Sequence, residues 1–113
     1  MSEFESGSIV SEPISRDHAQ VIWTETALAD IQRHYETLKL IDGGVALRSV
    51  QVIRKAGDSL DTFPRRGAIV NEVAGLRKLQ VTFGKVGFTM HYAVIEDEVV
   101  ILKVYYGREN RPN

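Results

Sequence analysis

The chain has no cysteine, only three histidines and three prolines, and no long hydrophobic run. The lack of cysteine excludes disulfides, thiolate nucleophiles and zinc–cysteine sites, and it fits a cytoplasmic protein. The histidines, His18, His34 and His91, do not have the spacing of metal ligands, so we expect no metal site and no cofactor. Because no stretch of about 18 apolar residues occurs, the sequence predicts no membrane span and no membrane partner.

Charge is nearly balanced over the whole chain but is unevenly distributed along it. The net charge of −1 argues against bulk nucleic-acid affinity, which depends on neutralising phosphates. Residues 1–20 carry four acidic side chains against one arginine, a net charge of −3. Residues 48–85 carry eight basic side chains against three acidic ones, so they form either a basic binding surface or an ordinary solvated face.

Residues 1–19 show no helical or strand periodicity. They are rich in serine and glutamate, and they lack the basic start and the apolar stretch of a secretory signal. We therefore predict a flexible N-terminal arm over residues 1–19, followed by a single domain over residues 20–113. A chain of 113 residues is long enough to build one hydrophobic core.

The domain begins with a predicted strand and two amphipathic helices. Residues 20–23 form a short apolar run that is typical of a strand. Apolar residues then recur at steps of three and four over 27–38 and over 46–60, which predicts two helices. Asp42-Gly43-Gly44 separates them, and Phe63-Pro64 ends the second because the residue before a proline leaves the helical region. The helices therefore form an antiparallel hairpin.

The apolar period changes to two after the helices. It predicts strands over residues 78–83, 88–94 and 99–106, joined by short loops. The resulting order, β-α-α-β-β-β, predicts an α+β domain in which both helices cover one face of a small antiparallel sheet. On the last strand, alternation predicts that the residues facing the helices are Val100, Leu102, Val104 and Tyr106.

The opposite face of the predicted sheet is unusually apolar for a surface in contact with water. Two helices cannot shield both sides of one sheet, and an uncovered apolar face usually marks an interaction surface. Partial cover by residues 61–75 or by the N-terminal arm is the alternative. The candidate partner-binding residues on this face are Ala93, Ile95, Val99, Ile101, Lys103 and Tyr105.

The order of the elements and of several short motifs resembles the RelE/ParE toxin superfamily. The similar segments are V-I-W-T-E-T-A-L-A-D-I at 21–31, Phe63-Pro64 with Gly67, Leu76 to Leu79, and the run from Gly87 to Asn110. The resemblance implies the same fold and the toxin of a type II toxin–antitoxin system of the plasmid-stabilisation type. It also implies a cognate antitoxin, similar to ParD or RelB, that binds the apolar face described above.

The superfamily contains two activities, and a shared fold does not choose between them. ParE-like members bind and poison DNA gyrase, whereas RelE-like members cleave mRNA on the ribosome without a metal ion. RelE-like ribonucleases typically hold arginine at the positions of Thr89 and Glu109, and lysine near Gln80 and Thr82. Neutral or acidic side chains cannot stabilise the charge of a phosphoryl transition state. The resemblance therefore implies a ParE-like gyrase inhibitor that is not an enzyme.

Each activity has its own candidate residues under this resemblance. Contacts with gyrase are expected at a basic loop and along the C-terminal strand, at Arg65, Arg66, Tyr105, Arg108 and Arg111. If the chain is instead a ribonuclease that acts on ribosome-bound mRNA, the catalytic candidates are Arg77, Lys78, Lys85, His91 and Arg108. His91 and Tyr92 are adjacent on a strand and so point to opposite faces. An inactive family member, a solvated role for Arg65 and Arg66, and a homodimer stay open as alternatives.

Overall fold

The structure is a computed structural model that describes residues 18–107. The predictions for residues 1–17 and for Arg108, Glu109 and Arg111 lie outside this range. The elements, in chain order, are β2 (Gln20–Trp23), α1 (Glu25–Lys39), α2 (Gly43–Asp58), two 3-10 turns η1 (Ser59–Asp61) and η2 (Pro64–Arg66), β3 (Ala68–Asn71), β4 (Leu76–Val81), β5 (Phe88–Ile95) and β6 (Glu98–Tyr106).

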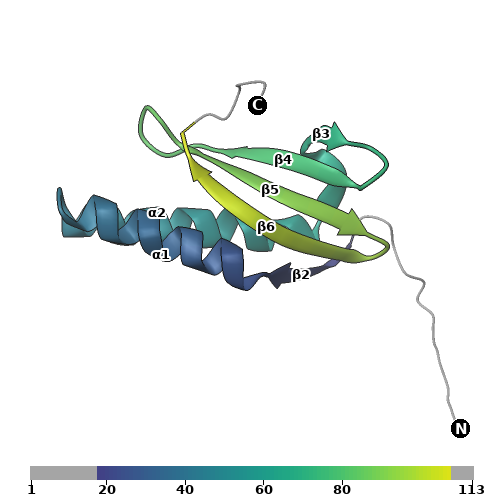
Figure 1. The fold of residues 1–113 in the computed structure, drawn as a ribbon, viewed down its shortest axis with the longest axis horizontal. Helices are drawn as coiled ribbons and strands as arrows, with labels where there is room; N and C mark the ends of the chain where they lie inside the picture. Colours follow the sequence, from purple (N-terminus) through teal and green to yellow (C-terminus); the bar gives the residue numbers. More distant parts are fainter. Residues whose placement is uncertain (1–17, 108–113) are drawn as a thin grey trace, which may run out of the picture.

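The predicted helical hairpin is present, and each helix begins at a side-chain cap. However, α2 includes Gly43 and Gly44 of the predicted break and ends at Asp58, before Phe63-Pro64. The Thr24 hydroxyl accepts a hydrogen bond from the Ala27 amide at 3.1 Å, and the Asp42 carboxylate accepts one from the Val45 amide at 3.1 Å. Such caps satisfy amides that have no partner within the helix. The two helices pack against each other and run below the sheet in Figure 1.

The sheet has five strands in the order β2-β6-β5-β4-β3 (Figure 1). β2 pairs parallel to β6, and the remaining neighbours are antiparallel. The predicted β-α-α-β-β-β order is confirmed, and β3 is an additional strand within the predicted connection over residues 61–75. All four residues of β3 are exposed. Because the strand has no buried face, its sequence shows no alternation of apolar and polar residues from which it could be predicted.

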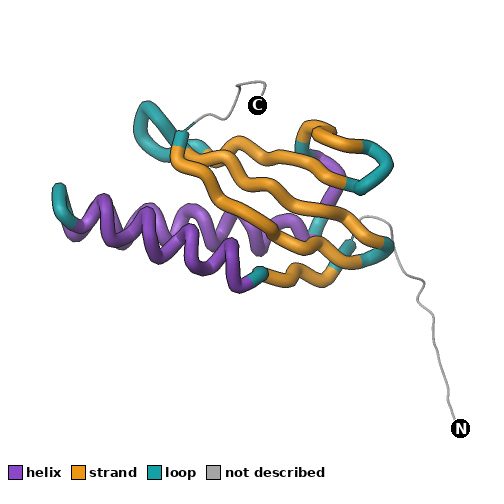
Figure 2. The backbone as a smooth tube through the Cα atoms, in the orientation of Figure 1, coloured by secondary structure: helices purple, strands orange, loops and turns teal. Residues whose placement is uncertain are grey.

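Both helices lie on the same side of the sheet, which gives a two-layer domain (Figure 2). The core lies between the layers and takes its largest buried side chains from α2, η1 and the two central strands. They include Ile53, Leu60, Phe88, Met90, Tyr92, Val99, Ile101 and Val104. The side chains of β5 that alternate with this set point to the other side of the sheet.

A β-bulge in β6 overturns the predicted facing of its first half. His91 pairs with Lys103, but the next residue of β5, Tyr92, pairs with Ile101, so Leu102 is an extra residue. Such a bulge shifts the alternation of side chains by one position. The predicted placement of Val99 and Ile101 on the partner-binding face is therefore wrong, because both are fully buried against the helices.

The same bulge corrects two further expectations for β6. Val100 and Leu102 were expected to face the helices but lie on the opposite side, where both are half-buried. Beyond the bulge the predicted alternation holds, and Val104 is fully buried. Tyr106 faces the helix layer, with its ring 5.5 Å from that of Phe88, but it is 55% exposed and is not a core residue.

Side chains of the first helix cap the edge of β6 where β2 ends. β2 pairs with β6 only as far as Ile101. The Thr24 hydroxyl donates to the Ile101 carbonyl at 2.7 Å, the buried Asp30 carboxylate accepts from the Val104 amide at 2.9 Å, and the His34 ring lies 2.7 Å from the Val104 carbonyl. These bonds satisfy backbone groups that a sheet edge otherwise leaves unpaired, and they fix α1 on the bulged strand.

Candidate functional site

The side of the sheet away from the helices is the candidate functional site, and we call it the open face. No element within residues 18–107 lies over it. β5 contributes Thr89, His91, Ala93 and Ile95, and the strand register sets the neighbours of each from β4 and β6. Those neighbours are Leu76, Lys78 and Gln80 on β4 and Glu98, Val100, Lys103 and Tyr105 on β6, and the bulge residue Leu102 lies between Val100 and Lys103 along the chain.

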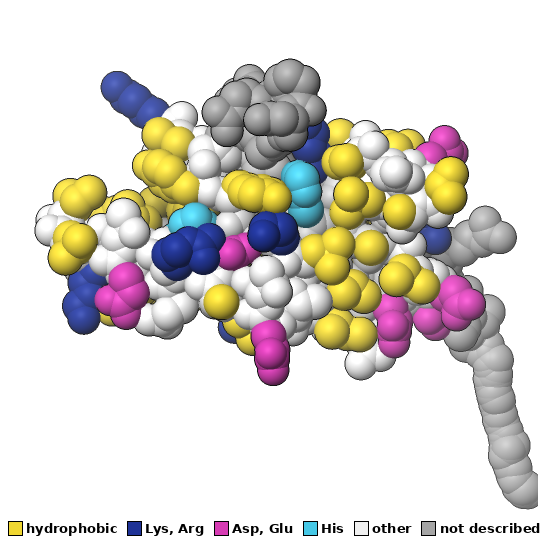
Figure 3. All heavy atoms as spheres, in the orientation of Figure 1, with side chains coloured by type: hydrophobic (Ala, Val, Ile, Leu, Met, Phe, Trp, Pro, Cys, Tyr) yellow, Lys and Arg dark blue, Asp and Glu magenta, His cyan; other side chains and the backbone are white. Residues whose placement is uncertain are grey.

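One half of the open face is apolar except for Glu98, the register partner of Ile95. It lies near the β5–β6 turn and includes Ala93, Ile95, Val100 and Leu102, with Ile22 beside Val100 in the register. Ile95 is 53% exposed. Figure 3 shows hydrophobic side chains gathered over this end of the sheet. An apolar surface of this kind favours contact with another protein.

The other half of the open face carries a row of basic side chains. Lys78, His91 and Lys103 are cross-strand neighbours on β4, β5 and β6. The Tyr105 ring lies edge-on to the His91 ring, with 5.0 Å between their centroids, and the Lys103 ammonium lies 5.8 Å from the Tyr105 ring centroid. The row therefore brings two cations and an imidazole side by side.

Thr89 lies next to this row and is fully buried. Its hydroxyl is 2.8 Å from the Gly107 carbonyl and 3.1 Å from the side-chain oxygen of Gln80. These contacts occupy the hydroxyl within the fold. The position therefore carries no charge toward a ligand.

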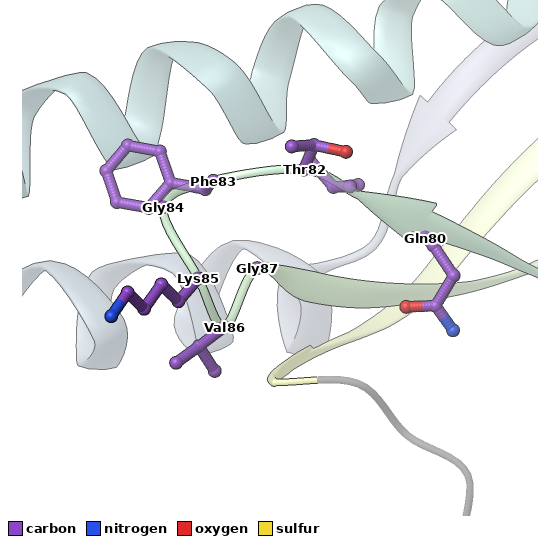
Figure 4. Close-up of a pocket in the computed structure, with 8 residues that line it drawn as sticks. Gln80, Thr82, Phe83, Gly84, Lys85, Val86 and Gly87 are labelled. Atoms are coloured by element: carbon purple, nitrogen blue, oxygen red, sulfur yellow. The ribbon is translucent and has the colours of Figure 1, made fainter.

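The structure does not bring the candidate catalytic residues together. Arg77 points away from the open face, because its guanidinium donates to the carbonyls of Arg65 and Gly67, each at 2.8 Å. Lys85 lies in the β4–β5 loop, where Figure 4 shows its side chain extending away from Gln80. Among the candidate catalytic residues that the structure describes, only Lys78 and His91 are cross-strand neighbours.

Arg65 and Arg66, two of the residues expected to contact gyrase, lie in η2, whereas Tyr105 lies on the open face. Arg66 donates to the Ser59 and Thr62 carbonyls at 3.2 and 3.1 Å, so its guanidinium ties η2 to η1.

The Tyr92 hydroxyl donates to the Pro64 carbonyl at 2.7 Å and accepts from the Gly67 amide at 2.9 Å. Burial raises the pKa of Tyr92, and this outweighs the hydrogen bond from Gly67 and the nearby arginines, which lower it.

Neither a metal centre nor a membrane span is found in the part of the chain that the structure describes. Residues 18–107 contain no group of three or more histidine or acidic side chains able to hold a metal ion. None of the helices in the same range is long and apolar enough to cross a membrane.

Comparison with known proteins gives one matching family and several similar solved structures, of which two are described here. The model of the ParE toxin of the type II toxin–antitoxin system parDE matches residues 21–111. A structure of the chromosomal ParDE system from P. aeruginosa is 26% identical, has a TM-score of 0.66, and aligns over 81% of this chain and 99% of that chain. The RelBE2 toxin–antitoxin complex from Mycobacterium tuberculosis is 20% identical, has a TM-score of 0.57, and aligns over 85% and 98% of the two chains. A search of curated proteins finds no match.

The fold is thus that of the RelE/ParE toxin superfamily, as the sequence resemblance implies. Within it, the chain belongs to the ParE toxin family and is a ParE-type toxin of a type II toxin–antitoxin system.

Sequence reasoning missed Val100 and Leu102 as residues of the open face. Val99, Val100, Ile101 and Leu102 form an unbroken apolar run, which is compatible with either facing. The bulge could only have been suspected from the lysine that follows, since Lys103 is exposed and cannot share a face with Ile101.

Proposed function

We propose that this toxin acts by binding DNA gyrase and does not cleave RNA. The state of Thr89 is the observation that carries this proposal. The resemblance to ribonucleases requires a cation at this position, and here a buried hydroxyl lies against Gly107 and Gln80. A cation aimed at the developing phosphate charge is usually a large part of such catalysis, and a neutral group cannot replace it. We further propose a cytoplasmic location, because gyrase acts there.

We also propose that a cognate antitoxin neutralises the toxin by covering the apolar half of the open face. The corrected contact set replaces Val99 and Ile101 by their open-face neighbours Val100 and Leu102, next to Ile95. An apolar surface flanked by the exposed Lys103 fits a segment that combines apolar and acidic residues. The similar P. aeruginosa structure is of a ParDE toxin–antitoxin system, which supports a partner of this kind.

RNA cleavage on the ribosome is the second candidate function, and the row Lys78–His91–Lys103 favours it. An imidazole in this row could take the proton of a ribose 2′-hydroxyl as that oxygen attacks phosphorus. The flanking ammonium groups could stabilise the phosphate, and one of them could donate a proton to the 5′ oxygen as its bond to phosphorus breaks, which leaves a 2′,3′-cyclic phosphate. The row differs from the predicted catalytic set in its use of Lys103 in place of Arg77 and Lys85.

Induction of the chain in bacteria separates these functions. Gyrase binding predicts a DNA-damage response with intact mRNA, and this response should persist in a Lys78→Ala/His91→Ala double variant. Cleaved mRNA that becomes intact in the double variant would establish the second candidate. Normal growth of cells that contain the folded chain would identify an inactive family member.

A further inference from the structure

A groove lies on the helix side of the sheet, between α2 and the outer side of β4. It has a volume of about 470 Å³, and Gln80 is the residue that it shares with the set given above for the open face. Val52 and Ala56 of α2 and Leu79 and Val81 of β4 contribute apolar surface to it. Two cationic side chains, Lys55 and Arg66, also line it, and both are exposed. The groove therefore fits a segment that is apolar and acidic.

The backbone of β4 is open along this groove. β3 pairs only with Leu76, Arg77 and Lys78, so within residues 18–107 the remainder of β4 has no strand on its outer side. A Cβ added to Gly67 would lie 2.7 Å from the Lys78 carbonyl oxygen, which places that oxygen on the outer side. Backbone groups alternate in direction along an antiparallel strand, so the amide and carbonyl of Gln80 point outward as well. An extended peptide can pair with them.

The described part of the chain begins close to one end of the groove. His18 forms a β-bridge with Thr62, and the Ala19 amide donates to the Asp61 carbonyl at 2.8 Å. Arg66, which lines the groove, donates to the Thr62 carbonyl at 3.1 Å. Seventeen residues precede His18. At about 3.3 Å per residue they can reach well past β4.

The composition of residues 1–17 complements the groove. The segment has four acidic side chains against one arginine, whereas the groove presents Lys55 and Arg66. It also contains the apolar pair Ile9-Val10 between two serines, with Glu12 nearby. A tether so close to the site raises the effective concentration of the segment, so weak contacts are enough to populate the bound form.

We propose that the N-terminal segment of this chain docks in the α2–β4 groove. The stretch around Ile9 and Val10 pairs with the backbone of Gln80, and its carboxylates face Lys55 and Arg66. The free toxin thereby covers an apolar groove with its own chain. This inference is independent of which target the toxin binds.

A spin label on the arm of the full-length chain tests the docking. The chain has no cysteine, so Ser8→Cys accepts a nitroxide at a single position. Broadening of amide signals should be strongest at residues 79–82 and 52–59. Lys55→Glu should reduce this broadening at least about twofold, because it reverses a charge that attracts the arm. Lys39→Glu, the same change at the far end of α1, should leave it unaltered.

Three results would overturn the proposal. Broadening spread evenly over the domain means that the arm has no site. Broadening centred on Ile95 and Val100 means that the arm covers the open face. Broadening of an unlabelled, isotope-enriched chain by a spin-labelled one means that the arm of a second copy fills the groove.

Discussion

The two faces of the sheet differ in what their side chains must do. On the helix side, β5 contributes Phe88, Met90 and Tyr92, all fully buried. On the open face the same strand contributes a buried threonine, a half-buried histidine and the exposed Ile95. These three positions are alike because each of them builds the core. The open face mixes apolar, basic and aromatic groups that the core does not require, which is typical of a surface that binds other molecules.

The largest effect should come from truncating neighbouring residues of β6 on the two faces. Ile101→Ala should lower the free energy of unfolding by about 2–5 kcal/mol, because it leaves a cavity in the core. Leu102→Ala removes a side chain of the same size from the half-buried open face and should cost about 1 kcal/mol or less. Chemical denaturation measures both. Equal losses would contradict the bulge and the facing derived from it.

The bond between Asp30 and β6 gives the next largest effect. Asp30→Ala leaves the buried Val104 amide without its 2.9 Å acceptor and should cost about 1–3 kcal/mol. Glu36→Ala, on the same helix, removes an exposed partner of Gln32 and should change stability by about 0.5 kcal/mol or less. Thermal unfolding of the two variants compares them. A neutral Asp30→Ala would mean that α1 does not cap the edge of β6.

Two tyrosines sharpen the comparison between the faces. Tyr92→Phe removes the partner of the Pro64 carbonyl and the Gly67 amide and should cost about 1–3 kcal/mol. Tyr105→Phe, on the open face, should stay within about 0.5 kcal/mol of the parent chain. If Tyr105→Phe were the more destabilising of the two in chemical denaturation, the open face would be part of the core.

Tyr92 should also shape stability at alkaline pH. Its pKa is raised in the folded state, so the folded protein keeps the phenol proton at a pH where the unfolded chain has lost it. Its contribution is therefore complete below the ordinary tyrosine pKa of 10.0 and is lost as the pH rises above it. As the pH rises above 10, the free energy of unfolding should fall less for Tyr92→Phe than for the parent chain. Parallel curves would show that Tyr92 ionises equally in both states.

The smallest effect should come from removing the N-terminal arm. A chain that begins at Gln20 should melt within a few degrees of the full chain, since docking of the arm through the groove adds only weak contacts. A much larger drop in melting temperature, measured by circular dichroism, would show that residues 1–19 are an essential part of the domain.

Much of this fold could be predicted from local signals in the sequence. Thr24 and Asp42 are typical N-caps, and the apolar period changes from three-and-four to two where the helices give way to strands. β3 could not be predicted, because all of its side chains are exposed and its pairing with β4 is set by tertiary structure. The bulge in β6 was hidden for the opposite reason, since every residue from Val99 to Leu102 is apolar.

The candidate site could be predicted in part for the same physical reasons. Alternation on β5 correctly separates His91 and Ala93 from Tyr92, because no bulge interrupts that strand. Alternation on β6 also places Lys103 and Tyr105 on the open face correctly, because both residues follow the bulge. The α2–β4 groove depends on how far β3 extends along β4, which no local pattern reveals. The roles of all these residues in binding stay predictions.

Inhibition of DNA supercoiling by the purified chain tests the central claim most directly. Gyrase that is mixed with relaxed plasmid and increasing amounts of the toxin should lose its supercoiling activity, and ribosome-bound mRNA mixed with the same preparation should stay intact. Uninhibited gyrase together with cleaved mRNA would contradict the proposed function and would assign the basic row of the open face to catalysis.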